Sequence, residues 1–188
     1  QFNVEGLAQS LEKHGKSHNK LIVLLNFPNN PTGYSISRPE ADAIVLALKA
    51  AAARGTHLVV IHDDAYFGLF FEPEVMRESL FALTANLDER ILAVKLCGAS
   101  KEEFVWGLRV AFITFGTIAK NAEALYSALE KKATGIVRSY TSNGSHLSQT
   151  LVLKALQDAN FRVEQREKFA VLEKRARRVK EILALPKY

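Results

Sequence analysis

The chain has 188 residues, of which 48% are hydrophobic and 24% are charged, and its formal net charge is +5. This length and composition suit one sizeable globular domain, or one domain with part of another. No apolar run is long enough to span a bilayer, and the amino terminus shows no basic-then-apolar signal segment. The single cysteine, Cys97, excludes an internal disulfide and a cysteine-rich zinc site, and it favours a cytoplasmic location.

The positive charge does not gather into one nucleic-acid-binding patch. The densest basic stretch, residues 162–180, places Glu164, Glu167 and Glu173 between its lysines and arginines. Interleaved opposite charges are typical of a solvated helix face. We therefore predict no nucleic-acid partner and no membrane partner.

The first predicted elements are a weakly helical stretch at 4–13 and an apolar strand at 21–27. The strand ends in the turn-rich run 28–33, which contains Asn, Pro and Gly. The residues at 37–40 fit a capping box, and they open a helix that continues to about residue 54.

Two further strands are predicted at 57–62 and 91–96, with a helix at 74–87 between them. Strands that alternate with helices are joined by right-handed crossovers, which gives a parallel sheet with helices on its faces. A fourth strand at 109–115 follows too soon for another crossover helix, and Gly107 favours a tight return. We therefore expect this strand to run antiparallel to its neighbour.

The rest of the chain is predicted to be helical at 120–133, 145–158 and 161–183, with an irregular segment at 136–144. The last helix is long and highly charged, and we interpret it as a connector to a further part of the protein. The expected fold class is α/β: a mostly parallel sheet with one antiparallel strand and flanking helices, followed by long helices.

Polar and reactive side chains follow the predicted parallel strands at the same end. Asn30 follows the first strand, Asp63 and Tyr66 follow the second, and Lys101 follows the third. Each has an ordinary explanation by itself, such as a turn, a helix cap, an ion pair or a surface position. A metal site at Asp63 and Asp64 lacks a further cluster of ligands, so no metal is predicted. Because ligands of open α/β sheets bind outside the carboxyl ends of the strands, the joint pattern predicts one site there.

Three motifs carry this pattern: Asn30-Pro31-Thr32-Gly33, Asp63-Asp64-Ala65-Tyr66, and Ser100-Lys101 with Gly107-Leu108-Arg109. In order and spacing they resemble the class I and II aminotransferases, the pyridoxal-phosphate enzymes of fold type I. The resemblance covers essentially the whole chain. It implies pyridoxal 5'-phosphate as the cofactor and a homodimer as the working form of the full-length protein.

The resemblance also implies a role for the residues around the reacting part of the cofactor. Lys101 would form an imine with the cofactor aldehyde and then move the substrate α-proton. Asp63 would pair with the pyridine nitrogen and keep it protonated, so that the ring accepts the electrons left by that proton. Asn30 and Tyr66 would hydrogen-bond the ring phenolate oxygen and tune the basicity of the imine, which gives Tyr66 a catalytic role.

The phosphate of the cofactor would be held by Arg109 and Ser100, a task that suits a planar guanidinium. By the same resemblance, Arg138, Ser142 and Asn143 belong to a segment that crosses the dimer interface. There they would reach the phosphate and the substrate in the partner's active site. The prolines that usually follow this segment are missing from the sequence.

Two departures from the family pattern stand out. Gly98 occupies a position where the family often has a phosphate-binding serine, which removes one hydrogen bond, worth about 1 kcal/mol net. Family members are also longer. We therefore expect a fragment, in which 1–135 is the second half of the cofactor-binding large domain. Residues 136–188 would be an interface segment and a long helix leading into a small domain that is absent.

The predicted function is part of a pyridoxal-phosphate-dependent aminotransferase, which moves an amino group between an amino acid and a 2-oxo acid. The isolated fragment is expected to be inactive and to bind the cofactor weakly. Two alternatives stay open: another enzyme of the same fold, such as a β-eliminating lyase or a decarboxylase, and a non-catalytic truncated domain. The sequence does not reveal the amino-acid specificity, although Arg138 could read a distal carboxylate.

Overall fold

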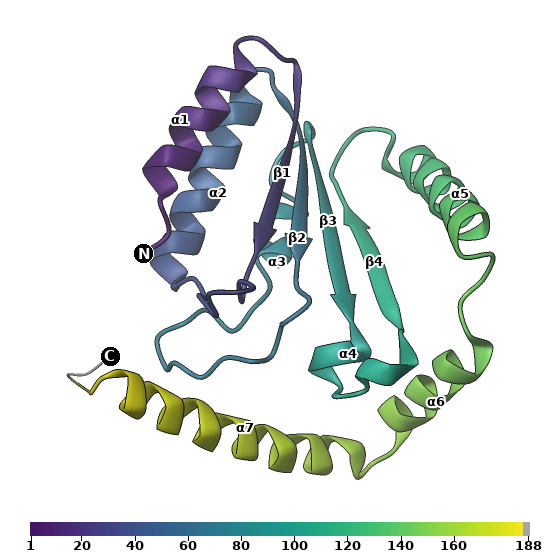
Figure 1. The fold of residues 1–188 in the computed structure, drawn as a ribbon. Helices are drawn as coiled ribbons and strands as arrows, with labels where there is room; N and C mark the ends of the chain where they lie inside the picture. The colour runs from purple at the N-terminus through teal and green to yellow at the C-terminus, as the bar shows by residue number, and fades with distance from the viewer. Residues whose placement is uncertain (186–188) are drawn as a thin grey trace.

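The computed structural model describes residues 1–185 of the chain as a sheet with two long helices on one face, followed by an arm of helices (Figure 1). The strands are β1 (Lys20–Asn26), β2 (His57–Asp63), β3 (Ile91–Gly98) and β4 (Ala111–Gly116). The helices are α1 (Val4–Gly15), α2 (Arg38–Ala53), α3 (Phe81–Thr84), α4 (Ala99–Glu102), α5 (Ala122–Tyr140), α6 (His146–Gln157) and α7 (Phe161–Leu183), with a 3-10 turn at Trp106–Leu108. The last three residues of the predicted segment 136–188 lie outside the described residues.

The sheet has four strands in the order β1-β2-β3-β4. The first three run parallel, and β4 pairs antiparallel with β3. The predicted fold class is therefore confirmed, including the reversed direction of the last strand. The turn between β3 and β4 contains only α4 and the 3-10 turn, which is too little chain for a crossover back to the other end of the sheet.

One face of the sheet is covered by α1 and α2 (Figure 1). The capping box that opens α2 is present, with Ser37 donating both its backbone N–H and its hydroxyl to the Glu40 carboxylate, at 2.8 and 2.7 Å. Alternate strand residues then meet the apolar stripe of this helix. Ile44, Leu48 and Val60 are completely buried at this contact, which forms the centre of the main core.

The opposite face of the sheet carries apolar side chains that are open to solvent in the described part of the chain. Ile22 and Leu24 on β1 are 70% and 63% exposed, and Ile113 on β4 is 49% exposed. Strand residues alternate between the two faces, so these side chains are the outward counterparts of the buried ones. The residues at the ends of the strands on this same open face are Asn26 and Asp63.

The predicted helix at 74–87 is wrong for most of its length, because only Phe81–Thr84 is helical. Val75 instead forms an antiparallel bridge with Ser37, and the Met76 N–H donates to the Ile36 carbonyl at 2.9 Å. Backbone pairing with a distant segment and burial of Met76, which is 8% exposed, hold this stretch extended. Tertiary contacts have overridden a modest helical preference.

The helical arm α5–α7 has little core of its own, since α5 and α7 contain no buried residue. The arm contacts the sheet region through α7, where Phe169 stacks on Phe71 at 5.6 Å and Lys180 pairs with Glu72. The predicted irregular segment 136–144 is wrong in its first half, because α5 continues to Tyr140. None of the helices within residues 1–185 has the length and hydropathy required to cross a membrane.

Candidate active site

The parallel strands β1, β2 and β3 end side by side, so the loops that follow them meet at one edge of the sheet. Asn26 at the end of β1 is in register with Asp63 at the end of β2, and Asp63 is in register with Leu96 on β3. A cavity of about 680 Å³ opens at this edge. Its lining includes the six predicted cofactor-binding residues Asn30, Asp63, Tyr66, Ser100, Lys101 and Arg109.

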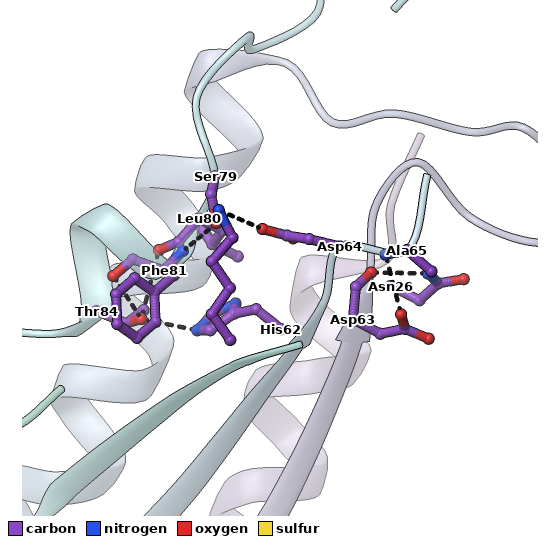
Figure 2. A network of polar contacts seen from close by, with 10 residues as sticks. Asn26, His62, Asp63, Asp64, Ala65, Ser79, Leu80, Phe81 and Thr84 are labelled. Carbon is purple, nitrogen blue, oxygen red and sulfur yellow. Dashed lines mark hydrogen bonds and ion pairs between the residues drawn. The ribbon is translucent and has the colours of Figure 1, made fainter. Parts of the chain in front are cut away.

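Asn26 joins the first two loops, and the sequence analysis did not single it out. Its side-chain N–H donates to the Asp63 carbonyl at 2.9 Å, and its side-chain oxygen accepts the Asn30 backbone N–H at 2.8 Å (Figure 2 shows the contact with Asp63). One amide thus fixes the two loops relative to each other. The signal in the sequence is weak: a polar residue ends an apolar strand, just before the turn that carries Asn30.

Asp63 begins a tight turn, in which its carboxylate accepts the Ala65 N–H at 3.1 Å (Figure 2). This bond uses one of the two carboxylate oxygens, and Asp63 is among the residues that line the cavity. Two residues beyond Asp64, Tyr66 also lines the cavity, and the Lys101 ammonium lies 5.6 Å from the centre of its ring. An ammonium over an aromatic face is held by the ring quadrupole. The turn therefore places a phenol against the amine and a carboxylate in the lining of the same cavity.

Arg109 is held in an unusual backbone conformation, with φ 54° and ψ 44° in the left-handed region. Its guanidinium donates to the Ser100 hydroxyl and to the Trp106 carbonyl, both at 3.2 Å. It lies in the turn before β4, whereas the sequence predicted it as the first residue of that strand. Arg109 and Ser100 together present a guanidinium and a hydroxyl at one end of the cavity, an arrangement suited to an oxyanion.

Gly98, the position where the family often has serine, is packed closely against the start of β4. A Cβ atom at this position would lie 3.1 Å from the Val110 carbonyl oxygen and 3.4 Å from the Ala111 Cβ. A serine would therefore require β4 to move by a few tenths of an ångström. Gly98 is therefore part of the local packing. The hydroxyl that a serine would offer at this position is absent, and the backbone of the next strand takes up the space.

A buried polar layer lies on the other side of the strand ends. His62 is 1% exposed and shares a hydrogen bond of 2.7 Å with Thr84 (Figure 2). Burial, together with the charge of Lys95, lowers the pKa of His62 to about 4. Asp64 is 5% exposed, and its carboxylate lies 3.5 Å from the Lys95 ammonium. Burial raises the pKa of Asp64, while Ser79 and Lys95 act in the opposite direction.

Arg138, Ser142 and Asn143 do not reach the cavity that contains Lys101. They line a separate cavity of about 570 Å³ between α5 and β4, and the Arg138 guanidinium donates to the Ser142 carbonyl and hydroxyl at 3.2 and 3.1 Å. Ile113 borders both cavities. Their predicted function in a partner subunit concerns a second chain and stays a prediction. Within residues 1–185, no three His, Cys, Asp or Glu side chains are grouped to hold a metal ion.

The sheet order, the reversed last strand and the polar residues at three strand ends define an open α/β protein with a candidate ligand site at the carboxyl ends of its strands. The family described as aminotransferase class I and II matches residues 1–185. The chain therefore belongs to the class I and II aminotransferase family. No curated protein sequence matches the chain.

Solved structures of aminotransferases share this fold. An aminotransferase from Anaerococcus prevotii superimposes with a TM-score of 0.78 at 24% identity, over 92% of this chain and 42% of that one. An aspartate aminotransferase from Thermotoga maritima superimposes with a TM-score of 0.63 at 25% identity, over 92% of this chain and 39% of that one. An aromatic-amino-acid aminotransferase from Burkholderia pseudomallei, covalently bound to pyridoxal phosphate, superimposes with a TM-score of 0.69 at 22% identity, over 95% of this chain and 42% of that one. The chain thus spans less than half the length of these proteins.

Proposed function

We propose that this chain is part of a pyridoxal-phosphate-dependent aminotransferase, which transfers an amino group between an amino acid and a 2-oxo acid. The observation that carries the proposal is the single cavity at the strand ends, where an amine, a carboxylate, a phenol, an amide, a guanidinium and a hydroxyl converge. Membership of the aminotransferase family supports it. So does the fold shared with a protein that binds pyridoxal phosphate covalently.

The groups around the cavity fit pyridoxal 5'-phosphate in size and chemistry. Its volume, about 680 Å³, lies within the range of about 300 to 1,000 Å³ that is usual for small-molecule sites. Asp63 offers an acceptor for a protonated ring nitrogen, and Asn30 and Tyr66 offer donors for a ring oxygen. Arg109 with Ser100 offers a cradle for a phosphate. Lys101 supplies the one amine among the residues that line the cavity.

When bound, the cofactor supplies a conjugated ring that accepts the electrons left by an ionised substrate bond. In this proposal the Asp63 carboxylate holds a proton at the ring nitrogen, which is the charge state that favours electron uptake. The Lys101 Nζ, as the neutral amine, would accept the α-proton of the substrate and return it, because Lys101 is the one amine among the residues that line the cavity. Tyr66 orients this amine through the contact of its ring, while Arg109 fixes the phosphate end.

For the whole protein we propose a cytoplasmic homodimer, in which Arg138, Ser142 and Asn143 of one chain extend the site of the other. We also keep the division into a large-domain half at 1–135 and an interface-and-connector part at 136–188. The exposed cavity between α5 and β4 is compatible with this role, because within residues 1–185 Arg138 donates side-chain hydrogen bonds only to Ser142 and lies on the surface. The isolated chain is proposed to be inactive.

The test is covalent capture of the cofactor. The full-length protein that contains this chain is mixed with pyridoxal 5'-phosphate, reduced with borohydride, digested and examined by mass spectrometry. We expect the cofactor mass on the peptide of Lys101, no labelling in Lys101→Ala, and unchanged labelling in the surface control Lys49→Met. An unlabelled Lys101 peptide in the wild type would contradict the proposal.

Two further measurements separate the reactions. With a single amino acid, an aminotransferase converts the bound cofactor to its amine form, which changes the absorbance, and it releases a 2-oxo acid without ammonia. Release of ammonia or of carbon dioxide would identify a lyase or a decarboxylase instead. The isolated chain should show no stable complex at micromolar cofactor; a tight one-to-one complex would contradict the expected weak binding.

A further inference from the structure

The strongest feature outside the cavity is the ion pair on the covered face of the sheet, directly behind Asp63. Asp64 follows Asp63 in the chain, and Figure 2 shows the two carboxylates pointing in different directions, Asp64 toward Ser79 and Asp63 away from it. The Asp64 carboxylate is buried, and the Lys95 ammonium on β3 lies 3.5 Å from its oxygen. A buried carboxylate is strongly unfavourable without such compensation.

Lys95 contacts both ends of one short turn. Besides Asp64, its ammonium lies 4.9 Å from the centre of the Phe67 ring. The turn itself is closed by the Phe67 N–H, which donates to the Asp64 carbonyl at 2.9 Å. Tyr66 lies within this turn. One side chain from β3 therefore clamps the segment that carries the phenol of the site.

The same strand leads to Lys101. β3 passes from Lys95 to Gly98 and continues directly into α4, which contains Lys101. The Asp64 N–H also donates to the Leu96 carbonyl of β3 at 2.8 Å. Lys95 therefore holds the turn that carries Tyr66, and the Tyr66 ring in turn lies against the Lys101 ammonium on α4, the helix that directly follows β3.

We infer that Lys95 is a positioning residue of the active site: from the covered face of the sheet, its ammonium holds the 64–67 turn so that Tyr66 stays against Lys101. The inference rests on the proposed function only in taking pyridoxal phosphate as the ligand of the cavity. Lys95 itself is not among the residues that line the cavity. Its effect is carried by Asp64 and Phe67.

The other charged groups near the pair do not replace this clamp. Asp63 and Glu102 are acidic and add repulsion to the Asp64 carboxylate or to its surroundings. Ser79 lowers the pKa of Asp64, and its hydroxyl accepts a hydrogen bond from the Phe81 N–H at 3.2 Å. Lys95 is thus the cation that holds both ends of the turn.

The first experiment measures the turn directly, without cofactor, by hydrogen exchange of the peptide that covers residues 63–68 in the full-length protein. We expect Lys95→Met to exchange about tenfold faster there, whereas Lys95→Arg stays close to the wild type and Lys49→Met is unchanged. If Lys95→Met does not fold, Lys95→Met combined with Asp64→Asn removes both charges, and the faster exchange is still expected. Exchange at the wild-type rate in Lys95→Met, or in the double variant, would overturn the inference.

The second experiment is a double-mutant cycle on the dissociation constant of pyridoxal phosphate, measured by absorbance. Lys95→Met and Tyr66→Phe should each raise the dissociation constant about tenfold. The double variant should have a dissociation constant no higher than that of the single variant that binds less tightly, because both substitutions act through one contact. Additive losses would show that Lys95 does not act through Tyr66. Absence of binding by the wild type would refute the proposed function instead, and the exchange experiment would still test Lys95.

Discussion

The two faces of the sheet differ sharply, and neighbouring residues of one strand show it best. Leu25 on β1 faces α1 and α2 and is 5% exposed, whereas Leu24 beside it faces the other way and is 63% exposed. The same alternation separates buried His62 from Asp63, which lines the cavity. The covered face supplies stability, and the open face carries the candidate site.

This division explains how a site can be assembled without weakening the core. Each strand sends one residue inward and the next outward, so the identity of Asp63 is independent of the packing around Leu58 and Val60. The inward residues can be chosen for volume and the outward ones for chemistry. Substitutions on the covered face should therefore change stability, whereas those on the open face should change binding or association and cost little stability.

The largest effect is expected for the matched pair of leucines. Leu25→Ala should lower the free energy of unfolding by about 2 to 5 kcal/mol, because it leaves a cavity in the packed face. Leu24→Ala should cost less than about 1 kcal/mol, since most of the side chain is already in water. Urea unfolding followed by circular dichroism measures both. Equal losses would mean that the open face is covered in solution.

The next largest effect is a loss of stability in acid that is caused by His62. Its pKa is lowered to about 4 in the folded protein, mainly by burial, from 6.5 in the unfolded chain. The unfolded state therefore binds the proton more readily, and stability is lost as the pH falls from about 6.5 to 4. The loss should be about 2 to 3 kcal/mol. His62→Gln should flatten the curve of unfolding free energy against pH in this window. If the slope of this curve is the same in the variant and the wild type, His62 is not held neutral in the folded protein.

A smaller effect is expected at lower pH from Glu40, which caps α2 on the covered face. Partial burial raises its pKa, but hydrogen bonds from Tyr34, Ser37 and Phe2 outweigh burial and lower the pKa to about 2, from 4.5 in the unfolded chain. The carboxylate therefore contributes stability above pH 4.5 that is lost as the pH falls toward 2. Because Glu40 is partly exposed, we expect about 1 to 2 kcal/mol. Glu40→Gln should lose this dependence in the same titration.

The smallest effect is expected on the open face itself. Ile22→Thr should change the free energy of unfolding by no more than about 0.5 kcal/mol, because Ile22 is 70% exposed and makes few packing contacts. It should instead reduce self-association of the isolated chain, since it removes part of a contiguous apolar surface. Light scattering at several concentrations measures this. Scattering equal to that of the wild type would show that Ile22 is not part of the associating surface.

The sheet and the cavity could be predicted from the sequence because their signals are local. Short apolar runs ended by turn residues mark β1, β2 and β3, and parallel pairing then brings Asn30, Asp63 and Lys101 to one edge without further information. The reversed β4 followed from the length of one connection. The roles of these residues with a cofactor stay predictions.

The remaining features could not be predicted because they depend on partners that are distant in sequence. The 74–87 stretch is extended since Val75 pairs with Ser37. Asn26 matters because it bonds Asp63 across two strands, and Lys95 because it meets Asp64 from a neighbouring strand. Near 136–144 the helix continues past Gly135, with Ser139 and Thr141 bonded to carbonyls of the preceding turn.

The backbone conformation of Arg109 matters for the redesign of this chain. A left-handed backbone at φ 54° suits glycine, and a residue with a side chain costs about 1 kcal/mol there. A search guided by stability alone would therefore select glycine at this position and count it as an improvement. The same choice would delete the guanidinium that faces the cavity beside Ser100. At this position, thermostability favours glycine, whereas the proposed ligand site needs arginine.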